Sequence, residues 1–210
     1  MKDYLLISNT KDNKISNFYL DLVSSHIQKS TNEQVYCREL SSRKAYEWGL
    51  ASNKYDPKLE KVMSDFQSNY GIDCNFIKTT EKRKKKLLIA DMDSTIIKEE
   101  SLDELARQIG KEKEVSFITN EAMNGRIEFK KALEDRVAIL KGNSTDILEN
   151  LKKNININHG ARELVKTMNM NGSITVLVSG GFTFLTEYLK ELLGFKHTHA
   201  NTLQIIQKEL

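Results

Sequence analysis

Two aspartates one residue apart follow a short apolar run, and carboxylates in that arrangement can carry out catalysis. Residues 87–90 read Leu-Leu-Ile-Ala, typical of a buried strand, and Asp91 and Asp93 come directly after them. Side chains two residues apart on an extended chain point to the same side, so both carboxylates can face one site. Close carboxylates repel each other and resist ionisation unless a cation lies between them. Mg²⁺, which prefers oxygen ligands and phosphate, meets that need.

A carboxylate pair of this kind suits phosphoryl transfer. One carboxylate attacks phosphorus and forms an aspartyl-phosphate, and the other protonates the leaving oxygen and later takes a proton from water. A second strand-like run, residues 174–178, ends in Ser179, Gly180 and Gly181, whose hydroxyl and amides can hold phosphate oxygens. Either motif alone is more often a simple turn. Because both follow strands of one predicted sheet, they reinforce each other.

The elements that must position these residues occur in the order strand, helices, strand, helix, which is typical of a parallel sheet. In such open α/β sheets, ligands bind beyond the carboxyl ends of the strands. The segment between the two strands, to about residue 158, is predicted to be mostly helical. Its apolar helix faces comprise Leu102, Leu105, Ala106 and Ile109, then Phe129, Leu133, Val137 and Leu140, with Gly110 and Gly142 as the expected ends. Further helices are predicted over 161–168 and 184–192.

The first 79 residues read as a separate small α+β domain. Strands are predicted over 4–8, 34–40 and 72–77, and helices over 15–27 and 59–70, with Pro57 in the first turn and Gly71 as a C-cap. Trp48 is predicted to be a packing residue of this domain. Residues 80–86 are expected to form a basic linker, and residues 87–210 an incomplete catalytic domain. A nucleic-acid or lipid site in the basic run is disfavoured because no aromatic residues interleave with its lysines.

Bulk composition is ordinary for a soluble globular protein. The chain has 210 residues, of which 39% are hydrophobic and 29% charged, and its net charge of +3 is too small to indicate a nucleic-acid partner. Cys37 and Cys74 lie far apart without metal-ligand spacing, which favours a reduced, cytoplasmic setting. No apolar stretch approaches the roughly 20 residues that cross a bilayer, and the N-terminus lacks the pattern of an export leader, so no membrane association is expected.

Three separated segments carry a family resemblance. They are "LLIADMDSTII" at residues 87–97, "EAMNGRIEFKKALEDRVAILKG" at 121–142 and "VLVSGGFTFLTEYL" at 176–189. The first resembles the opening motif of haloacid-dehalogenase-type (HAD) phosphotransferases. Its Met-Asp-Ser-Thr form and the following "KEESLDELA" are similar to the phosphoserine phosphatase branch. The resemblance implies a HAD-like Rossmannoid α/β fold with a helical C1-type cap at about 98–158, preceded by a small α+β, ACT-like domain.

The resemblance also implies residue roles. Asp91 is the expected nucleophile and Asp93 the general acid/base, and the Asp91 carboxylate and the Asp93 carbonyl are the expected Mg²⁺ ligands. Phosphate would be held by Ser179 and Gly180, the substrate ammonium by Glu100, its carboxylate by Arg136, and the apolar wall would be Met123 and Phe129. Without the resemblance, Glu100 and Arg136 would be read as ordinary surface charges, and Met123 and Phe129 as core residues.

The expected activity is Mg²⁺-dependent hydrolysis of O-phospho-L-serine to L-serine and phosphate, the last step of serine biosynthesis, and a homodimer is left open. The alternatives are a phosphatase for another small phosphomonoester and an inactive remnant. The family pattern also requires a lysine and a Gly-Asp-Gly-x-Asn-Asp stretch after the second motif, and neither occurs up to Leu210. Lys208 falls where relatives have a hairpin turn and is not assigned as that lysine.

Because these motifs supply a phosphate ligand, a metal ligand and a strand beside residues 87–91, we expect the 210-residue chain alone to be weakly active or inactive. The first strand is expected to present an exposed apolar edge. His197 and His199 could be read as a metal pair, but two histidines without a third ligand are more often surface or strand residues.

Overall fold

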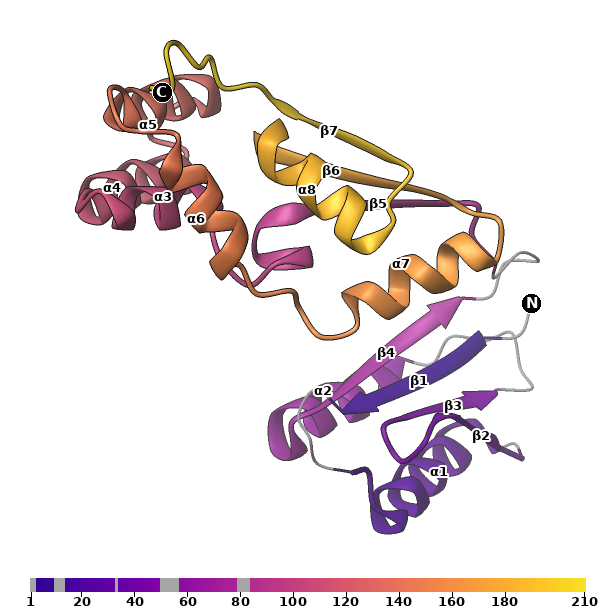
Figure 1. Ribbon diagram of the computed structural model, residues 1–210. Coiled ribbons are helices and arrows are strands. Elements are labelled where there is room, and N and C mark those ends of the chain that lie inside the picture. Colours follow the sequence, from indigo (N-terminus) through magenta and orange to yellow (C-terminus); the bar gives the residue numbers. More distant parts are fainter. Residues whose placement is uncertain (1–2, 10–13, 33, 50–56, 79–83) are drawn as a thin grey trace. The chain divides into compact units, whose positions relative to one another are not determined.

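The computed structural model describes residues 3–9, 14–32, 34–49, 57–78 and 84–210 (Figure 1). The chain divides into two compact units, Met1–Lys84 and Lys85–Leu210. Most of the predicted basic linker, residues 80–83, lies outside the described residues. Within the part of the chain that is described, no helix combines the length and apolar composition needed to span a bilayer.

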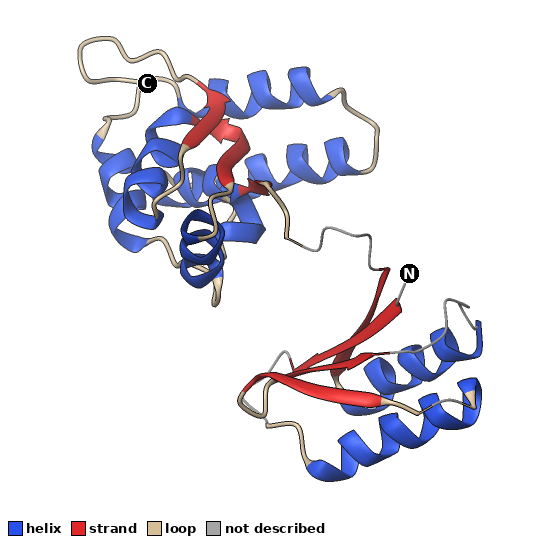
Figure 2. Ribbon diagram, turned by 90° about the vertical axis from the view of Figure 1, so that its right-hand side faces the viewer, coloured by secondary structure: helices blue, strands red, loops and turns tan. Residues whose placement is uncertain are grey.

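The first unit has the βαββαβ order of a ferredoxin-like domain. Its elements are β1 (Asp3–Asn9), α1 (Asn17–Thr31), β2 (Tyr36–Ser41), β3 (Ala45–Gly49), α2 (Pro57–Tyr70) and β4 (Ile72–Lys78). The antiparallel sheet has the order β2-β3-β1-β4, and both helices cover one of its faces (Figure 2). The predicted strands and helices are all present, with Gly71 in a left-handed conformation after α2.

Strand β3 was not predicted from the sequence. It carries a buried glutamate, Glu47, which interrupts the alternation of apolar residues expected in a strand. Arg38 on β2 forms an ion pair with Glu47 at 3.0 Å. The prediction that Trp48 packs in this unit is confirmed, because its side chain is fully buried. The indole Nε1–H of Trp48 donates to Ser24 Oγ on α1 at 2.9 Å, which satisfies its one polar group.

The second unit contains a three-stranded parallel sheet with helices between the strands. Its elements are β5 (Leu87–Asp91), α3 (Ser101–Gln108), α4 (Glu112–Met123), α5 (Phe129–Leu140), α6 (Asp146–Asn154), α7 (Ala161–Met170), β6 (Ile174–Phe182), α8 (Thr183–Leu193) and β7 (His197–Asn201). The sheet order is β5-β6-β7. One sheet face packs against α7 and α8 in a core that includes Ala90, Val165, Leu177, Leu185 and Leu189.

The prediction that residues 87–90 form a buried strand is wrong in part. Leu87 and Ile89 are 50% and 60% exposed, whereas Ala90 is buried. The physical reason is position, because β5 lies at the edge of the described sheet and only one of its faces meets the helices. Ile174 on β6 is exposed for the same reason, since it pairs with Leu87 on the uncovered face.

The helices α3 to α6 form one inserted segment between β5 and β6, and its two ends are joined by hydrogen bonds. Ile97 and Ile157 form an antiparallel bridge. The Glu99 carboxylate accepts from the Asn156 backbone N–H at 3.0 Å and from its side-chain amide at 2.6 Å. Nδ2 of Asn158 donates to the carbonyls of Thr95 and Ile97. These bonds hold the two ends of the helical segment together next to the turn Met92–Ile96, which follows β5.

We expect replacement of Glu99 by glutamine to weaken this junction in a pH-dependent way. Burial raises the pKa of the Glu99 carboxyl, but the hydrogen bonds from Asn156 outweigh burial and leave the pKa below its ordinary value of 4.5. A lowered folded-state pKa stabilises the protein above pH 4.5, and that stabilisation is lost as the pH falls through the folded pKa. Because the group is largely solvated, the expected cost at pH 7 is about 1 kcal/mol or less.

The measurement is thermal unfolding of both proteins at pH 7 and at successively lower pH below 4.5. The difference between wild type and Glu99→Gln should shrink as the medium becomes more acidic. Glu163→Gln, on the exposed face of α7, is the matched control and should show no such convergence. A Glu99→Gln deficit that stays constant over the whole acid range would contradict the linkage.

Candidate active site

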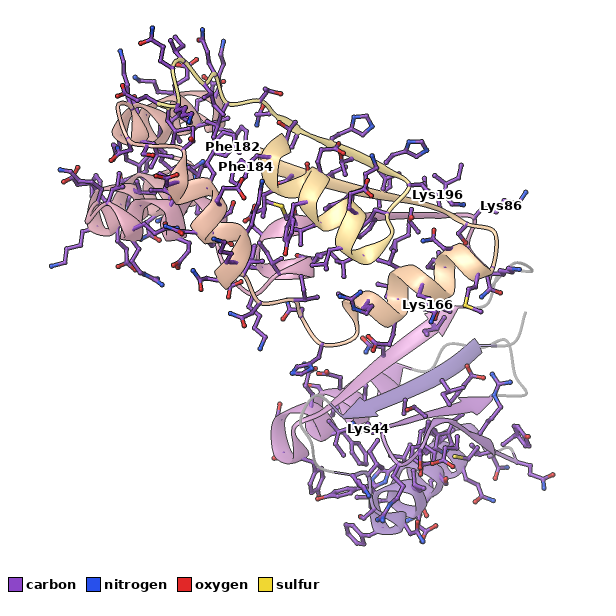
Figure 3. The ribbon with its side chains drawn as sticks, viewed as in Figure 1. Lys44, Lys86, Lys166, Phe182, Phe184 and Lys196 are labelled. Carbon is purple, nitrogen blue, oxygen red and sulfur yellow. The ribbon has the colours of Figure 1, made fainter. Side chains whose placement is uncertain are left out.

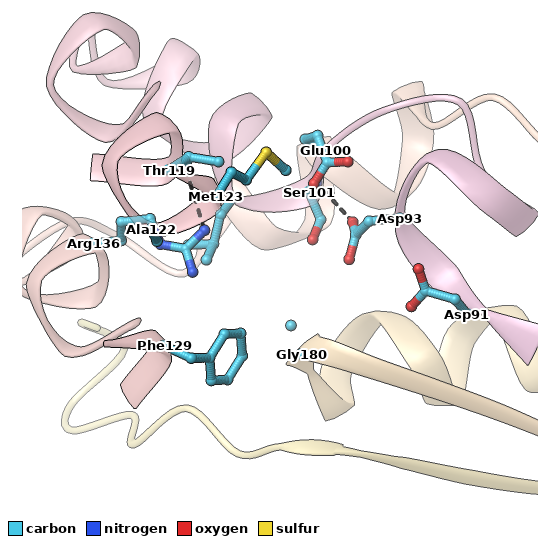
Figure 4. Close-up of a pocket in the computed structure, with 12 residues that line it drawn as sticks. Asp91, Asp93, Glu100, Ser101, Thr119, Ala122, Met123, Phe129, Arg136 and Gly180 are labelled. Carbon is cyan, nitrogen blue, oxygen red and sulfur yellow. Dashed lines mark hydrogen bonds between the residues drawn. The ribbon is translucent and has the colours of Figure 1, made fainter. Parts of the chain in front are cut away.

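The loop after β5 places the two aspartates. Residues Met92–Ile96 form a tight turn in which Ser94 adopts a left-handed conformation with φ of 50°. Met92 and Ile96 are buried and anchor the turn, while the Ser94 N–H donates to the Glu99 carbonyl at 3.1 Å. The chain therefore reverses direction immediately after the strand, and Asp91 and Asp93 point into the same cavity (Figure 4).

Asp93 joins this loop to the C-terminal part of β6. Its Oδ1 accepts from the Ser101 backbone N–H at 2.8 Å, and its Oδ2 accepts from the Ser179 hydroxyl at 3.1 Å. Ser179 Oγ in turn accepts from the Gly181 N–H at 2.8 Å. Both oxygens of Asp93 are therefore oriented by fixed donors from separate elements, as a proton-transferring carboxylate requires.

Two further contacts hold the C-terminal end of β6. Asn201 at the end of β7 donates from Nδ2 to the carbonyls of Gly180 and Gly181 at 2.9 and 3.3 Å. Phe182 and Phe184, labelled in Figure 3, stack with ring centroids 6.4 Å apart where β6 leads into α8. The backbone of the Ser-Gly-Gly segment is thus fixed before any ligand binds.

The cavity has a volume of about 360 Å³ and lies between these loops and the inserted helices. Seven of the eight residues predicted for the site line it: Asp91, Asp93, Glu100, Met123, Phe129, Arg136 and Gly180. The eighth, Ser179, is not a lining residue and reaches the site through its hydrogen bond to Asp93. The lining residues that sequence reasoning missed are Ser101, Leu102, Thr119 and Ala122, whereas Gly181 was expected as a source of backbone amide donors.

The missed residues on α4 had a detectable signal. Thr119 and Ala122 lie four residues and one residue before Met123, so Thr119 shares a helix face with a residue that the resemblance had already placed in the site. The missed Ser101 acts through its backbone N–H, and any residue type can supply such a donor.

The helices supply an apolar wall and two charges. Met123 and Phe129 are 75% and 60% exposed, so they face the cavity instead of the core. A Cβ atom at position 180 would lie 3.0 Å from the Phe129 ring, which explains glycine at this close approach. Glu100 Oε1 accepts from the Ser94 hydroxyl at 2.6 Å, and Arg136 lies across the cavity from the two aspartates (Figure 4).

The histidine pair and Lys208 lie away from this cavity lining. His197 and His199 alternate on β7 and are exposed. Gln207 and Lys208 have φ of 50° and 69° in a turn closed by reciprocal backbone hydrogen bonds between Ile206 and Glu209. Among the described residues, no group of three or more histidines, cysteines, aspartates or glutamates is arranged to hold a metal ion.

The sequence profile of the haloacid dehalogenase-like hydrolases matches residues 88–208. A phosphoserine phosphatase from Archaeoglobus fulgidus is 44% identical over 127 residues, which cover 60% of this chain and 37% of that protein. The alignments span 37% to 58% of the length of three such curated relatives, so the chain spans about half the length of the proteins that it matches.

Solved structures show the same relationship. A HAD family hydrolase from Salmonella enterica serovar Typhi superposes with a TM-score of 0.81 at 22% identity, over 100% of this chain and 70% of the other, a likeness of fold alone. A phosphoserine phosphatase described as a phospho-aspartyl intermediate analogue has a TM-score of 0.57 at 39% identity and covers 61% of each chain. With its parallel sheet and matching profile, this chain belongs to the haloacid dehalogenase-like hydrolase family.

Proposed function

We propose that this site hydrolyses O-phospho-L-serine to L-serine and phosphate through an aspartyl-phosphate on Asp91. The observation that carries the proposal is the arrangement of charge around one cavity. Asp91 and Asp93 lie at its sheet end, Glu100 lies beside Asp93 just before α3, and Arg136 lies across the cavity on α5. A phosphate here would meet a bound cation and the amides of the Ser-Gly-Gly segment, a carboxylate would meet Arg136, and an ammonium group would meet Glu100.

The relatives support this choice of substrate, because the Archaeoglobus fulgidus relative is a phosphoserine phosphatase. The name of the 39%-identical structure, a phospho-aspartyl intermediate analogue, supports the covalent route. In the same proposal, helices α3 to α6 form a C1-type cap, the first unit is an ACT-like domain, and the free thiols of Cys37 and Cys74 favour a cytoplasmic location.

The reaction proceeds in two steps, formation of the aspartyl-phosphate and its hydrolysis. A carboxylate oxygen of Asp91 attacks phosphorus, the bond from phosphorus to the serine oxygen breaks, and protonated Asp93 gives its proton to that oxygen. A water then attacks phosphorus, Asp93 takes the proton from the water, and phosphate leaves with Asp91 regenerated. The phosphate oxygens accept from the Gly180 backbone amide and from the Ser179 hydroxyl, which exchanges its bond to Asp93 for one to the phosphate.

The residues present fit a magnesium ion. The Asp91 carboxylate and the Asp93 backbone carbonyl are hard oxygen donors, and Mg²⁺ in phosphoryl-transfer sites commonly takes one or two carboxylates with substrate phosphate and water. When bound, the ion supplies positive charge that offsets the repulsion between the aspartates and the phosphate. Without a ligand, Asp93 has both carboxylate oxygens engaged with Ser101 and Ser179, so its backbone carbonyl is the oxygen that we assign to the ion.

The test is a substrate profile of wild type and of Glu100→Gln in Mg²⁺, at a protein concentration high enough to detect the weak activity expected of the 210-residue chain. Wild type should prefer O-phospho-L-serine to p-nitrophenyl phosphate. Glu100→Gln should lower kcat/KM for phosphoserine by about 10- to 100-fold, because a charged partner for the ammonium is lost, and that for the aryl ester by less than about threefold. Glu149→Gln, exposed on α6, is the matched control. A wild-type profile flat across phosphomonoesters would favour another small ester as substrate.

A further inference from the structure

The guanidinium of Arg136 is held by two helices before any ligand binds. Its Nε donates to the Ala132 carbonyl one turn earlier on α5 at 3.1 Å, and its Nη1 donates to Thr119 Oγ1 on α4 at 3.3 Å. Thr119 itself lines the cavity. The two bonds use two of the five N–H donors of the guanidinium, so three remain for a ligand.

The Thr119 hydroxyl can only act as an acceptor toward Arg136. Its single proton is donated to the Val115 carbonyl at 3.1 Å, one turn earlier on α4. The hydrogen bonds therefore run in one direction, from Arg136 to Thr119 and from Thr119 to Val115. A guanidinium has N–H donors and no acceptor, so it can bond only to a lone pair of its partner. The bond from Thr119 to Val115 turns the hydroxyl proton away from Arg136 and leaves an oxygen lone pair of Thr119 for it.

A third helix places negative charge near the guanidinium. Asp103 on α3 is half-buried, and its Oδ2 accepts from the Ser116 hydroxyl on α4 at 3.4 Å. Burial raises the pKa of the Asp103 carboxyl, while the bond from Ser116 and the charge of Arg136 act in the opposite direction. Helices α3, α4 and α5 thus all contribute to the surroundings of one cation.

We propose that Thr119 is a specificity-determining positioning residue, which fixes the Arg136 guanidinium so that its free donors face the carboxylate of the substrate. The inference deepens the proposed function and rests on it, since it requires a phosphomonoester that bears a carboxylate. Without the Thr119 oxygen, the long arginine side chain regains rotamer freedom that binding must then remove. Thr119 does not touch the reacting atoms, so it is not a catalytic residue.

The test uses two ligands that differ only in the carboxylate, O-phospho-L-serine and O-phosphoethanolamine. Their binding is measured by calorimetry with Mg²⁺ in an Asp91→Asn background, which prevents turnover. The parent should prefer phosphoserine by about tenfold or more. Thr119→Val should reduce this preference by about three- to tenfold through weaker phosphoserine binding alone, and Thr119→Ser should restore it. Thr167→Val, exposed on α7, is the matched control.

Every outcome of this binding experiment either supports or overturns the inference about Thr119. An unchanged preference in Thr119→Val, or equal weakening of both ligands, overturns the inference, because a merely structural role would affect both. Thr119→Ala provides a second variant should valine disturb α4, and circular dichroism checks the fold of each. Arg136→Ala distinguishes failure of this inference from failure of the proposed function. If it abolishes the preference while the Thr119 variants do not, only this inference fails. If it has no effect, carboxylate recognition and the proposed function fail together.

Discussion

Replacement of Asp91 by asparagine is expected to reduce phosphate release from O-phospho-L-serine to the level of a protein-free blank. An amide oxygen is a poor nucleophile toward phosphorus, so the covalent step is lost, and losses of a nucleophile are commonly about 10⁴-fold or more. The geometry should survive, because Asp91 is exposed at the end of β5 and the turn after it is anchored by Met92 and Ile96.

A second measurement does not depend on turnover. Beryllium fluoride mimics a phosphoryl group on an aspartate, so in Mg²⁺ it should raise the melting temperature of wild type and give a bound fluorine resonance by NMR. Asp91→Asn should show neither effect. Asp146→Asn, exposed in the first turn of α6, is the control and should behave as wild type. An adduct of undiminished occupancy in Asp91→Asn would place the nucleophile elsewhere.

The site residues at the carboxyl ends of β5 and β6 could be predicted because short stretches of sequence mark these strands. Apolar runs before Asp91 and Ser179 mark strands, and a parallel sheet brings the carboxyl ends of its strands to one edge. The structure confirms the strands and their parallel pairing, with Asp91 opposite Val178. The chemistry at these ends followed from residue types alone, namely two carboxylates on one loop and a hydroxyl with glycine amides on the other.

The cavity-lining residues on the inserted helices could not be predicted from hydrophobic periodicity. Met123 and Phe129 have the helical spacing of core residues, and periodicity cannot distinguish a face that covers a core from one that lines a cavity. Only the family resemblance placed them at the site. The spacing of Thr119 from Met123 could have placed it at the cavity, but its bond to Arg136 could not be predicted, because Arg136 is 17 residues away on another helix.

Burial was the least predictable property. The run before Asp91 has the composition of a strand covered on both faces, yet Leu87 and Ile89 are exposed in the described structure. Composition reports what a strand can bury, whereas burial depends on which elements cover each face. Strand β3 shows the opposite case, since Glu47 looks like a surface residue and is buried by its pairing with Arg38.

Replacement of Asp93 by asparagine should separate the two steps of the reaction. The asparagine oxygen can still accept from the Ser101 N–H, and its amide can donate to Ser179 Oγ, so the two loops stay joined. Proton transfer is lost, however, and hydrolysis of phosphoserine should fall by about 10²- to 10⁴-fold, because a serine alkoxide is a poor leaving group without a proton.

An aryl ester should respond differently, because p-nitrophenolate leaves without protonation. With p-nitrophenyl phosphate, Asp93→Asn should release a rapid burst of about one p-nitrophenol per site and then turn over slowly, since no base remains to activate the water that hydrolyses the aspartyl-phosphate. Rapid-mixing absorbance follows the burst, and Asp135→Asn on α5 serves as control. Equal slowing of the first step for both esters would mean that Asp93 acts on the geometry of Asp91 and not as the acid, because only the acid's contribution depends on the leaving group.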